Sequence, residues 1–230
     1  MTVPAGPSGP AGGSSGPSGS AAWTGQVGRP TRLLLLRHGQ TPLSVEKRYS
    51  GLGDPALTEL GESQAAGAAR RLADVPFDVI LTSPLQRARQ TAEAVSAATG
   101  VPVGVRDGLI ETNFGEWEGL TFVEARERDP ERFAKWLGAT DVAPPGGESF
   151  DVARIRVSAE LAAIVADHPG STVLVVSHVT PIKLILQEAL AVGVSILYRL
   201  HLDLASLSVA DFFPDGGASV RLVNDTSHLG

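Results

Sequence analysis

The sequence contains no cysteine, and this absence removes a whole set of functions. Disulfide bonds, zinc sites built on thiolates and cysteine nucleophiles all require a thiol, so none of them can occur here. The absence also fits a reducing compartment, and we expect a cytoplasmic location. No apolar run approaches the roughly 20 residues that a membrane-spanning helix needs, and the N-terminus lacks the charged and apolar regions of a signal peptide.

Positive charge is also in short supply. The 230 residues include 19 Lys and Arg against 25 Asp and Glu, for a formal net charge of -6 and a pI of about 5.4. Nucleic acids and anionic membranes are bound through clustered Lys and Arg, so we expect neither as a partner. A phosphorylated ligand would need a local group of basic residues that opposes the overall charge.

The first 28 residues hold no charged side chain and consist mainly of Gly, Pro, Ser and Ala. Such a segment cannot bury enough apolar surface to offset its ordering entropy, so we predict a disordered linker or tail over 1–30. Its one large apolar residue, Trp23, is expected to be incidental. The remaining residues, 31–230, suit one domain with a full-sized core.

Short apolar runs alternate with helical patterns in the rest of the chain. We expect strands over 32–36, 78–82, 101–105 and 172–176, and helices over 58–73, 85–99, 121–137, 148–167 and 181–191. Thr58 should cap the first helix, Gly100 should end the second, and Pro130 should divide the third. Two late strands, over 204–212 and 219–223, should form a hairpin. The alternation predicts a three-layer α/β/α sandwich with a mostly parallel central sheet.

The residues best suited to chemistry follow the expected strands. Arg37 and His38 come after the first strand, Arg87 after the second, Glu111 after the third and His178 after the fourth. Ligands of open α/β sheets bind beyond the carboxyl ends of the strands, so these side chains should converge at one edge. Two Arg, two His and one Glu in one place predict a phosphate site with a proton donor.

A phosphate monoester can be cleaved at such a site without a metal ion. Arg offers planar, charged, bidentate donors to the phosphoryl oxygens, and a neutral imidazole nitrogen can attack phosphorus. A carboxylic acid can protonate the departing alkoxide. Zinc bound by His38, His178 and Glu111 is the alternative use of these ligand types. Two neighbouring Arg would repel the metal, so we expect no metal and no cofactor.

Four motifs carry a resemblance to a known family. They are Arg-His-Gly-Gln-Thr at 37–41, Thr-Ser-Pro-Leu-Gln-Arg-Ala-Arg-Gln-Thr at 82–91, Glu-Thr-Asn-Phe-Gly-Glu-Trp-Glu-Gly at 111–119 and Val-Ser-His at 176–178. In this order they resemble the signature of the histidine phosphatase superfamily, in its phosphoglycerate mutase-like branch. The resemblance implies that His38 is the nucleophile and forms a phosphohistidine. It implies that Arg37, Arg87 and His178 bind the phosphate, and that Glu111 is the general acid and then the base.

The loop after the first motif extends the resemblance. Tyr49, Ser50 and Gly51 should form the rim of the substrate pocket, and Thr41 and Ser44 should also bind substrate. Many relatives have Asn at the position of Ser44, whose hydroxyl can still donate a hydrogen bond but with less reach. The segment 48–61 looks closest to α-ribazole phosphatases and acid phosphatases. It also resembles the C-terminal domain of actinobacterial fusions that carry a ribonuclease H domain upstream, which the N-terminal linker would fit.

Other residues near the motifs have competing interpretations. Glu116 and Glu118 are rivals of Glu111 for the role of acid, and Phe114 and Trp117 belong either to the substrate pocket or to the core. Four residues are expected to be structural, at the surface or in the core: Arg89, His168, His201 and His228.

We expect a phosphate monoester hydrolase that acts on α-ribazole 5′-phosphate or as a broad acid phosphatase. A phosphoglycerate mutase is the first alternative, although mutases of this type carry a longer, basic insertion where residues 119–146 are short and mixed in charge. A non-catalytic module that binds a phosphorylated ligand is the second. For the hydrolase we expect a bell-shaped pH profile with its optimum at or below neutrality, because His38 must be neutral while Glu111 is protonated.

Overall fold

The computed structural model describes residues 26–229. Most of the expected linker over 1–30, including Trp23, lies outside the described residues. The first described residues contact the hairpin formed by the last two strands. The side-chain amide of Gln26 donates to the carbonyl of Ala218, at the start of the last strand, over 3.3 Å, and the backbone N–H of Val27 donates to the carboxylate of Asp215, in the turn, over 3.0 Å.

One six-stranded sheet forms the centre of the protein, with the strand order β3-β2-β4-β1-β5-β6. The first four strands in this order pair in parallel, and β5 and β6 complete the sheet through antiparallel pairings. This arrangement confirms the predicted mostly parallel sheet and its late hairpin. The strands are β1 (Thr31–Arg37), β2 (Val79–Thr82), β3 (Val103–Val105), β4 (Thr172–Ser177), β5 (Leu207–Phe212) and β6 (Ala218–Asp225).

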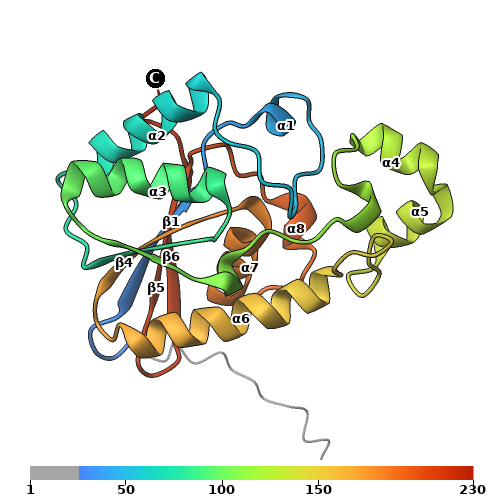
Figure 1. The fold of residues 1–230 in the computed structure, drawn as a ribbon. Coiled ribbons are helices and arrows are strands. Elements are labelled where there is room, and N and C mark those ends of the chain that lie inside the picture. Colours follow the sequence, from blue (N-terminus) through green and yellow to red (C-terminus); the bar gives the residue numbers. More distant parts are fainter. Residues whose placement is uncertain (1–25, 230) are drawn as a thin grey trace, which may run out of the picture.

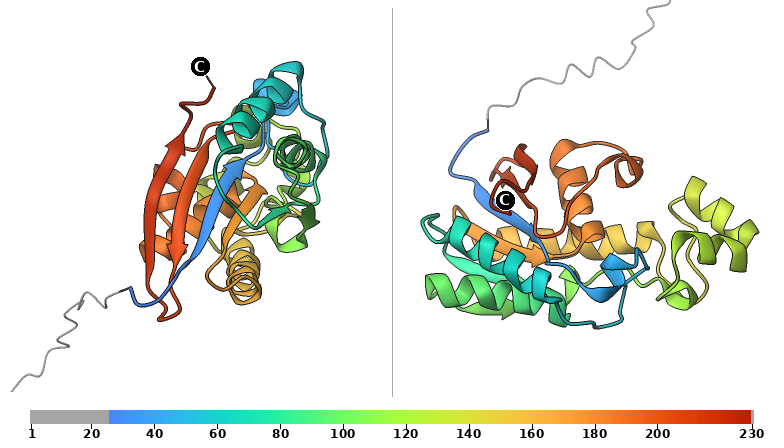
Figure 2. Two further views of the ribbon diagram at one scale, coloured as in Figure 1. Left: turned by 90° about the vertical axis from the view of Figure 1, so that its left-hand side faces the viewer. Right: turned by 90° about the horizontal axis from the view of Figure 1, so that it is seen from above.

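Helices cover both faces of the sheet, as Figures 1 and 2 show. The run of leucines in β1 alternates between the two sides: Leu34 and Leu36 lie in one hydrophobic cluster, and Leu33 and Leu35 lie in the other. The first cluster contains residues of α2 (Glu59–Leu72) and α3 (Gln86–Thr99), and the second contains residues of α6 (Phe150–Asp167) and α7 (Val179–Leu190). The strand is therefore buried on both faces, which explains its continuous apolar sequence.

Local signals set the ends of several helices as predicted. The hydroxyl of Thr58 accepts a hydrogen bond from the N–H of Gly61 and caps α2, and Gly100 ends α3 with a left-handed φ of 74°. Pro130 begins a new helix, so that α4 (Phe122–Arg128) and α5 (Pro130–Gly138) form the separate pair at the right of Figure 1.

Several predicted boundaries were wrong. Strand β3 begins at Val103 rather than at 101, and β6 extends to Asp225 rather than ending at 223. Three further differences have a visible cause. Helix α6 begins at Phe150 rather than at 148, because the Ser149 hydroxyl caps it and the N–H of Glu148 is taken by the carbonyl of Asn113. Helix α7 begins at Val179, two residues before Pro181, because His178 already has extended backbone and serves as the cap. Strand β5 begins only at Leu207, since Ala205 has a left-handed φ of 54° that interrupts an extended strand.

Four short elements had no clear sequence signal. They are α1 (Pro42–Val45), α8 (Ile196–Arg199) and two 3-10 turns, Asp107–Leu109 and Gly115–Trp117. Within residues 26–229, none of the helices is both long and apolar enough to cross a lipid bilayer.

Candidate active site

The two histidines predicted to act on phosphate lie beside each other at the carboxyl edge of the sheet. His38 follows β1 and His178 follows β4, and these two strands pair in parallel up to Arg37 and Ser177. Their ring centroids are 5.1 Å apart. Parallel pairing in register therefore brings together two residues that are 140 positions apart in the sequence.

The tautomer of His38 is fixed by its own backbone. Its Nδ1 atom lies 2.7 Å from the carbonyl oxygen of Gly39, and a carbonyl can only accept, so Nδ1 must carry the proton. The lone pair is then on Nε2. Burial, reinforced by the positive charges of Arg37 and Arg87, holds the pKa of His38 well below its usual 6.5. At neutral pH the ring is therefore uncharged and has a nucleophilic nitrogen.

His178 is fully buried and is held by a side chain from another strand end. Its Nε2 lies 2.7 Å from Oγ of Ser83, which follows β2. Its Nδ1 is buried and makes no hydrogen bond within the described part of the chain. Burial, and then the charge of Arg87, keeps the pKa of His178 well below 6.5, so this ring is also neutral.

Arg87 lies in the first turn of α3 with none of its surface exposed. Its Nη1 donates to the carbonyl of Gly53 over 2.8 Å, and its Nη2 donates to the carbonyls of Ser50 and Gly51 over 3.1 and 2.9 Å. Burial lowers the pKa of Arg87, while the charge of Glu111 acts in the opposite direction. The guanidinium is thus held rigidly by a loop.

Arg37 ends β1 and is held at one nitrogen. Its Nη1 donates to the carbonyl of Leu202 over 2.6 Å. Burial is the main reason that its pKa falls to about 10, and the charge of Glu111 partly offsets this effect. A group with a pKa of about 10 is still a cation at neutral pH, so the site keeps two positive charges.

Three buried nitrogens around His38 share one property: they make no hydrogen bond among residues 26–229. They are Nε of Arg37, Nε of Arg87 and Nδ1 of His178. A buried donor without a partner costs about 1–3 kcal/mol, and folded proteins contain few of them. The two Arg N–H donors, with Nδ1 of His178 when it carries the ring proton, form a preorganised site for the oxygens of a phosphoryl group.

Glu111 faces the same site from the segment after β3. Its side chain is buried, and Oε1 accepts from the backbone N–H of Thr112 over 2.8 Å. Oε2 lies 3.5 Å from the N–H of Thr180, at the start of α7. These contacts hold the carboxyl group in place and leave Oε2 with only one long hydrogen bond.

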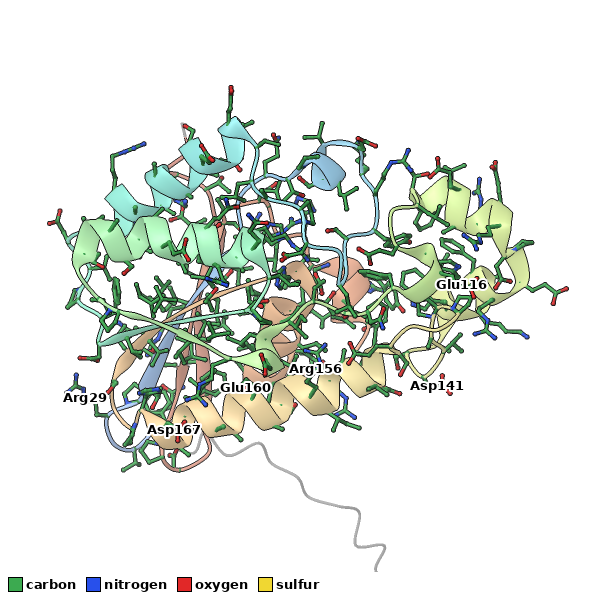
Figure 3. All side chains as sticks on the ribbon, in the orientation of Figure 1. Arg29, Glu116, Asp141, Arg156, Glu160 and Asp167 are labelled. Atoms are coloured by element: carbon green, nitrogen blue, oxygen red, sulfur yellow. The ribbon has the colours of Figure 1, made fainter. Side chains whose placement is uncertain are left out.

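A cavity of about 400 Å³ opens over His38, Arg37 and Glu111. Thr41, Ser44, Tyr49 and Ser50, which the sequence suggested for substrate binding, also line it. Arg87, His178 and Gly51 lie behind this surface rather than in the lining. A neighbouring cavity of about 530 Å³ also reaches Glu111. Its lining includes Arg156, on α6, and Asp141, and Figure 3 labels both residues.

Two of the predicted pocket residues have their polar groups engaged. The Ser44 hydroxyl donates to the carbonyl of Thr41 over 2.7 Å and accepts from the N–H of Thr41 over 2.9 Å. Ser44 and Thr41 thereby cap α1 reciprocally. The single proton of Ser44 is used inside the protein, so a hydrogen bond to substrate would require this cap to open.

The rest of the predicted rim contributes backbone, ring surface and two hydroxyls, those of Tyr49 and Ser50, which are buried and make no hydrogen bond within residues 26–229. Ser50 and Gly51 supply carbonyl oxygens to Arg87. The ring of Tyr49 packs on Phe114 with 4.7 Å between centroids, and burial raises the pKa of Tyr49 to about 12. Phe114 lines the cavity, whereas Trp117 is fully buried in the core.

Sequence reasoning missed part of the cavity wall. The wall also includes Lys47, Arg48, Val179, His201, Asp203 and Leu204. His201 is exposed and its Nε2 lies 3.0 Å from the Asp203 carboxylate, so it sits at the mouth of the cavity rather than in an unrelated surface position. Its spacing from the motifs carries no signal, because the segment after α8 brings it there.

The two rival carboxylates do not reach the cavity wall. Glu116 is exposed and pairs with Arg128 over 3.2 Å, and Glu118 accepts hydrogen bonds from the backbone of the 50–53 loop. His228 bonds the carbonyl of Ala205 through Nε2, in keeping with a structural residue. Among the side chains that the structure describes, no group of three or more His, Asp or Glu is arranged to hold a metal ion.

The comparison with protein families agrees with this geometry. Residues 33–226 match the model of the histidine phosphatase superfamily (branch 1), which is most of the chain. The chain belongs to this superfamily. The predicted family and fold are therefore confirmed, and the site described above occupies the edge of the sheet where the motifs were expected to meet.

The relatives include phosphatases and mutases. A bifunctional protein of Mycobacterium tuberculosis H37Rv is 56% identical over 211 residues, which are 91% of this chain and 58% of that protein. Phosphoserine phosphatase 1 of Hydrogenobacter thermophilus is 35% identical, over 86% of this chain and 94% of that enzyme. A 2,3-bisphosphoglycerate-dependent phosphoglycerate mutase of Nitrobacter winogradskyi is 34% identical, over 78% and 96%.

Solved structures of phosphatases share the fold. The α-ribazole phosphatase from Shigella flexneri aligns with a TM-score of 0.78 at 29% identity, over 85% of this chain and 96% of that one. A mycobacterial glucosyl-3-phosphoglycerate phosphatase aligns with a TM-score of 0.78 at 30% identity, over 86% of this chain and 100% of that one. Phosphatases are thus found both among the relatives of this chain and among its structural neighbours.

Proposed function

We propose that this protein hydrolyses phosphate monoesters through a phosphohistidine on Nε2 of His38. The observation that carries the proposal is the hydrogen bond between Nδ1 of His38 and the carbonyl of Gly39, because it places the lone pair on Nε2 of a neutral ring. Beside it lie three buried nitrogens that make no hydrogen bond within residues 26–229: Nε of Arg37, Nε of Arg87 and Nδ1 of His178. A nucleophile of defined tautomer and an electrostatic site for the transferred group are the two requirements of this chemistry.

In the first step, Nε2 of His38 attacks phosphorus and the bond from phosphorus to the leaving oxygen breaks. The phosphoryl oxygens accept hydrogen bonds from Arg37, Arg87 and His178 and spread the transferred charge. Protonated Glu111 gives its proton to the leaving alkoxide, so an alcohol departs and Glu111 becomes a carboxylate.

In the second step, the Glu111 carboxylate takes a proton from a water molecule as that water attacks the phosphohistidine. The bond from nitrogen to phosphorus breaks, inorganic phosphate forms, and Nε2 recovers its lone pair. The cycle closes with Glu111 protonated again. No redox partner or co-reactant other than water is required.

We also propose that the reaction needs no metal ion. Two Arg guanidinium groups supply the positive charge that Mg²⁺ or Zn²⁺ would otherwise supply at the phosphoryl group, and a divalent cation placed between them would be repelled. Activity that is unchanged by EDTA would support this part, and activity restored only by an added divalent cation would overturn it.

The substrate is proposed from the relatives' names as a small phosphate monoester, with α-ribazole 5′-phosphate as the first choice and broad acid phosphatase activity as the second. The test is phosphate release from p-nitrophenyl phosphate, α-ribazole 5′-phosphate, phosphoserine, glucosyl-3-phosphoglycerate and 3-phosphoglycerate. The parent and His38→Ala are compared, with acid-quench trapping of the phosphoenzyme. We expect release and trapping in the parent and neither in His38→Ala.

A phosphoglycerate mutase is the second candidate, because a mutase is among the relatives. Its segment after the Glu motif should protect a phosphoenzyme from water, whereas residues 119–146 here form only the two short helices α4 and α5 and the turn after them. Phosphate transfer to 3-phosphoglycerate faster than phosphate release would favour the mutase. A ligand-binding module without activity would give no trapped phosphoenzyme.

Two wider features stay proposals. We place the protein in the cytoplasm on the grounds of its composition, and we propose that a ribonuclease H domain precedes this one in the natural chain. The bifunctional name of the mycobacterial relative, of whose length this chain spans 58%, supports a second activity in that protein. Western blotting for the size of the native protein tests the fusion.

A further inference from the structure

The loop over residues 50–53 lies between two opposite charges. On one side its carbonyl oxygens accept hydrogen bonds from the guanidinium of Arg87. On the other side its N–H groups donate to the carboxylate of Glu118. We propose that Glu118 is a positioning residue that holds Arg87 in its phosphate-binding orientation through this loop. The inference rests on the proposed phosphatase function.

The contacts of Glu118 use both of its oxygens. The N–H of Gly51 lies 2.9 Å from Oε1 and 2.8 Å from Oε2, and the N–H of Gly53 lies 3.1 Å from Oε1. Backbone N–H groups that point at one anion are a common way to hold a loop, and hydrogen bonds to a charged acceptor are the stronger ones. One side chain therefore fixes two peptide groups of the loop.

One of these peptide groups links the two charges directly. The amide between Ser50 and Gly51 presents its carbonyl to Nη2 of Arg87 and its N–H to Glu118. Since C=O and N–H point in opposite directions in a trans peptide, its dipole is aligned between a cation and an anion. Rotation of this peptide would break both contacts at once. The hydrogen bond to Glu118 therefore also holds in place the carbonyl that binds Arg87.

The space around the loop allows little other movement. A Cβ atom on Gly51 would lie 2.5 Å from the carbonyl oxygen of Thr112, next to Glu111, and one on Gly53 would lie 2.7 Å from Oε1 of Glu118. The loop is therefore packed between the carboxylate and the segment that carries Glu111. The consequence for Arg87 is that both N–H groups of Nη2 and one of Nη1 are engaged by the loop, which leaves the buried Nε–H and the second N–H of Nη1 as donors for a ligand.

The arrangement excludes Glu118 from direct chemistry. It is not in the wall of the catalytic cavity, and its oxygens are used by backbone donors. Its effect on the reaction would pass through Arg87, whose pKa the negative charge of Glu118 helps to hold up against the larger effect of burial.

The test measures the dissociation constant of inorganic phosphate by calorimetry, together with kcat and KM, for the parent, Glu118→Gln and Glu118→Ala. We expect phosphate affinity and kcat/KM to fall by about 10-fold in Glu118→Gln and about 100-fold in Glu118→Ala, the range found for residues that orient ligating groups. Glu116→Gln is the matched control, because Glu116 is a nearby exposed carboxylate that only pairs with Arg128.

A second measurement separates positioning from a general loss of structure. In an Arg87→Ala background, Glu118→Gln should change phosphate affinity by less than about 2-fold, because the group that it positions is gone. A full additional loss in that background would overturn the inference. Glu118 would also be reassigned if its variants lost activity only with poor leaving groups, as expected of a general acid.

Failure of this inference can be told apart from failure of the proposed function. A parent that neither releases phosphate nor forms a phosphohistidine would refute the function itself. An active parent whose Glu118→Gln and Glu118→Ala variants keep the parental phosphate affinity would refute only the role of Glu118. If Glu118→Ala does not fold, Glu118→Gln, which keeps the side-chain volume, and the Arg87→Ala comparison still decide the question.

Discussion

Ser83 and His178 share one short hydrogen bond, with 2.7 Å between Oγ and Nε2, although they are 95 residues apart in the sequence. Oγ of Ser83 also lies 3.4 Å from the backbone N–H of Leu85, which can only donate. The serine proton is therefore free to point at Nε2 of His178. When the serine donates, Nε2 accepts and Nδ1 carries the proton, which is the form of His178 that can donate to a phosphoryl oxygen.

Replacing Ser83 by Ala should impair phosphate binding, although Ser83 acts on His178 and not on the substrate itself. His178 would lose its partner at Nε2 and could adopt the other tautomer, whose Nδ1 cannot donate. We expect kcat/KM to fall by about 10- to 100-fold, with phosphate release as the measurement. Ser96→Ala, which removes a hydroxyl bonded to the carbonyl of Val101 far from the site, is the control. Parental kinetics in Ser83→Ala would show that the tautomer is set by something else.

Much of the fold could be read from the sequence because its signals are local. The leucines of β1 and the Thr-Val-Leu-Val-Val run of β4 are continuous because both faces are covered, and Thr58 and Gly100 act on their own helix ends. The boundary near Pro181 was wrong because the cap is His178, whose backbone is set by the site rather than by a capping side chain.

The candidate site was predictable at the level of residues but not of contacts. Arg37, His38 and His178 were expected to meet because they stand at the ends of strands. Strands that are buried on both faces usually pair in parallel, and this brings their carboxyl ends to one edge of the sheet. Three contacts depend on loops. They are the hydrogen bonds from Arg87 to three loop carbonyls, the reciprocal cap that engages Ser44, and the position of His201 at the cavity wall. No spacing in the sequence encodes such contacts.

The buried histidines should make stability depend on pH. In the unfolded chain each titrates near 6.5, whereas in the folded protein the pKa of both His38 and His178 lies well below that value, chiefly because of burial. Below pH 6.5 the unfolded state binds more protons than the folded state. Stability is therefore fully present above about pH 6.5 and falls as the pH drops below it, by about 1.4 kcal/mol per pH unit for each histidine.

Urea unfolding between pH 5 and pH 8 measures this dependence. We expect a plateau above pH 6.5 and a decline below it, and His178→Gln should make the decline shallower by about 1.4 kcal/mol per pH unit. Carboxylates add their own decline at lower pH, so the window from pH 5 to pH 6.5 is the informative one. An equal slope in parent and His178→Gln would contradict the neutral state of the buried ring.

Gly51→Ala should disturb the catalytic centre through a backbone contact. The new Cβ would lie 2.5 Å from the carbonyl of Thr112, so either the 50–53 loop or the segment next to Glu111 must shift. We expect kcat/KM to drop by at least about 10-fold, since a displaced loop no longer holds Arg87. Gly138→Ala is the control, because nothing lies within 4 Å of a Cβ there. Gly138→Ala should keep parental kinetics. Similar losses in both variants would show that the loss in Gly51→Ala does not come from displacement of the 50–53 loop.

Glu111→Gln should reveal the proton donor through the leaving group. An amide cannot protonate an alkoxide, so kcat/KM for a sugar phosphate or phosphoserine should fall by about 10²- to 10⁴-fold. An activated aryl phosphate such as p-nitrophenyl phosphate needs little protonation and should lose far less. The Gln side chain can still accept from the N–H of Thr112, which keeps the local structure.

Glu116→Gln is the matched control for this variant. It should show no dependence of the loss on the leaving group, because its carboxylate is exposed and paired with Arg128. Equal losses for all leaving groups in Glu111→Gln would assign the proton to another group.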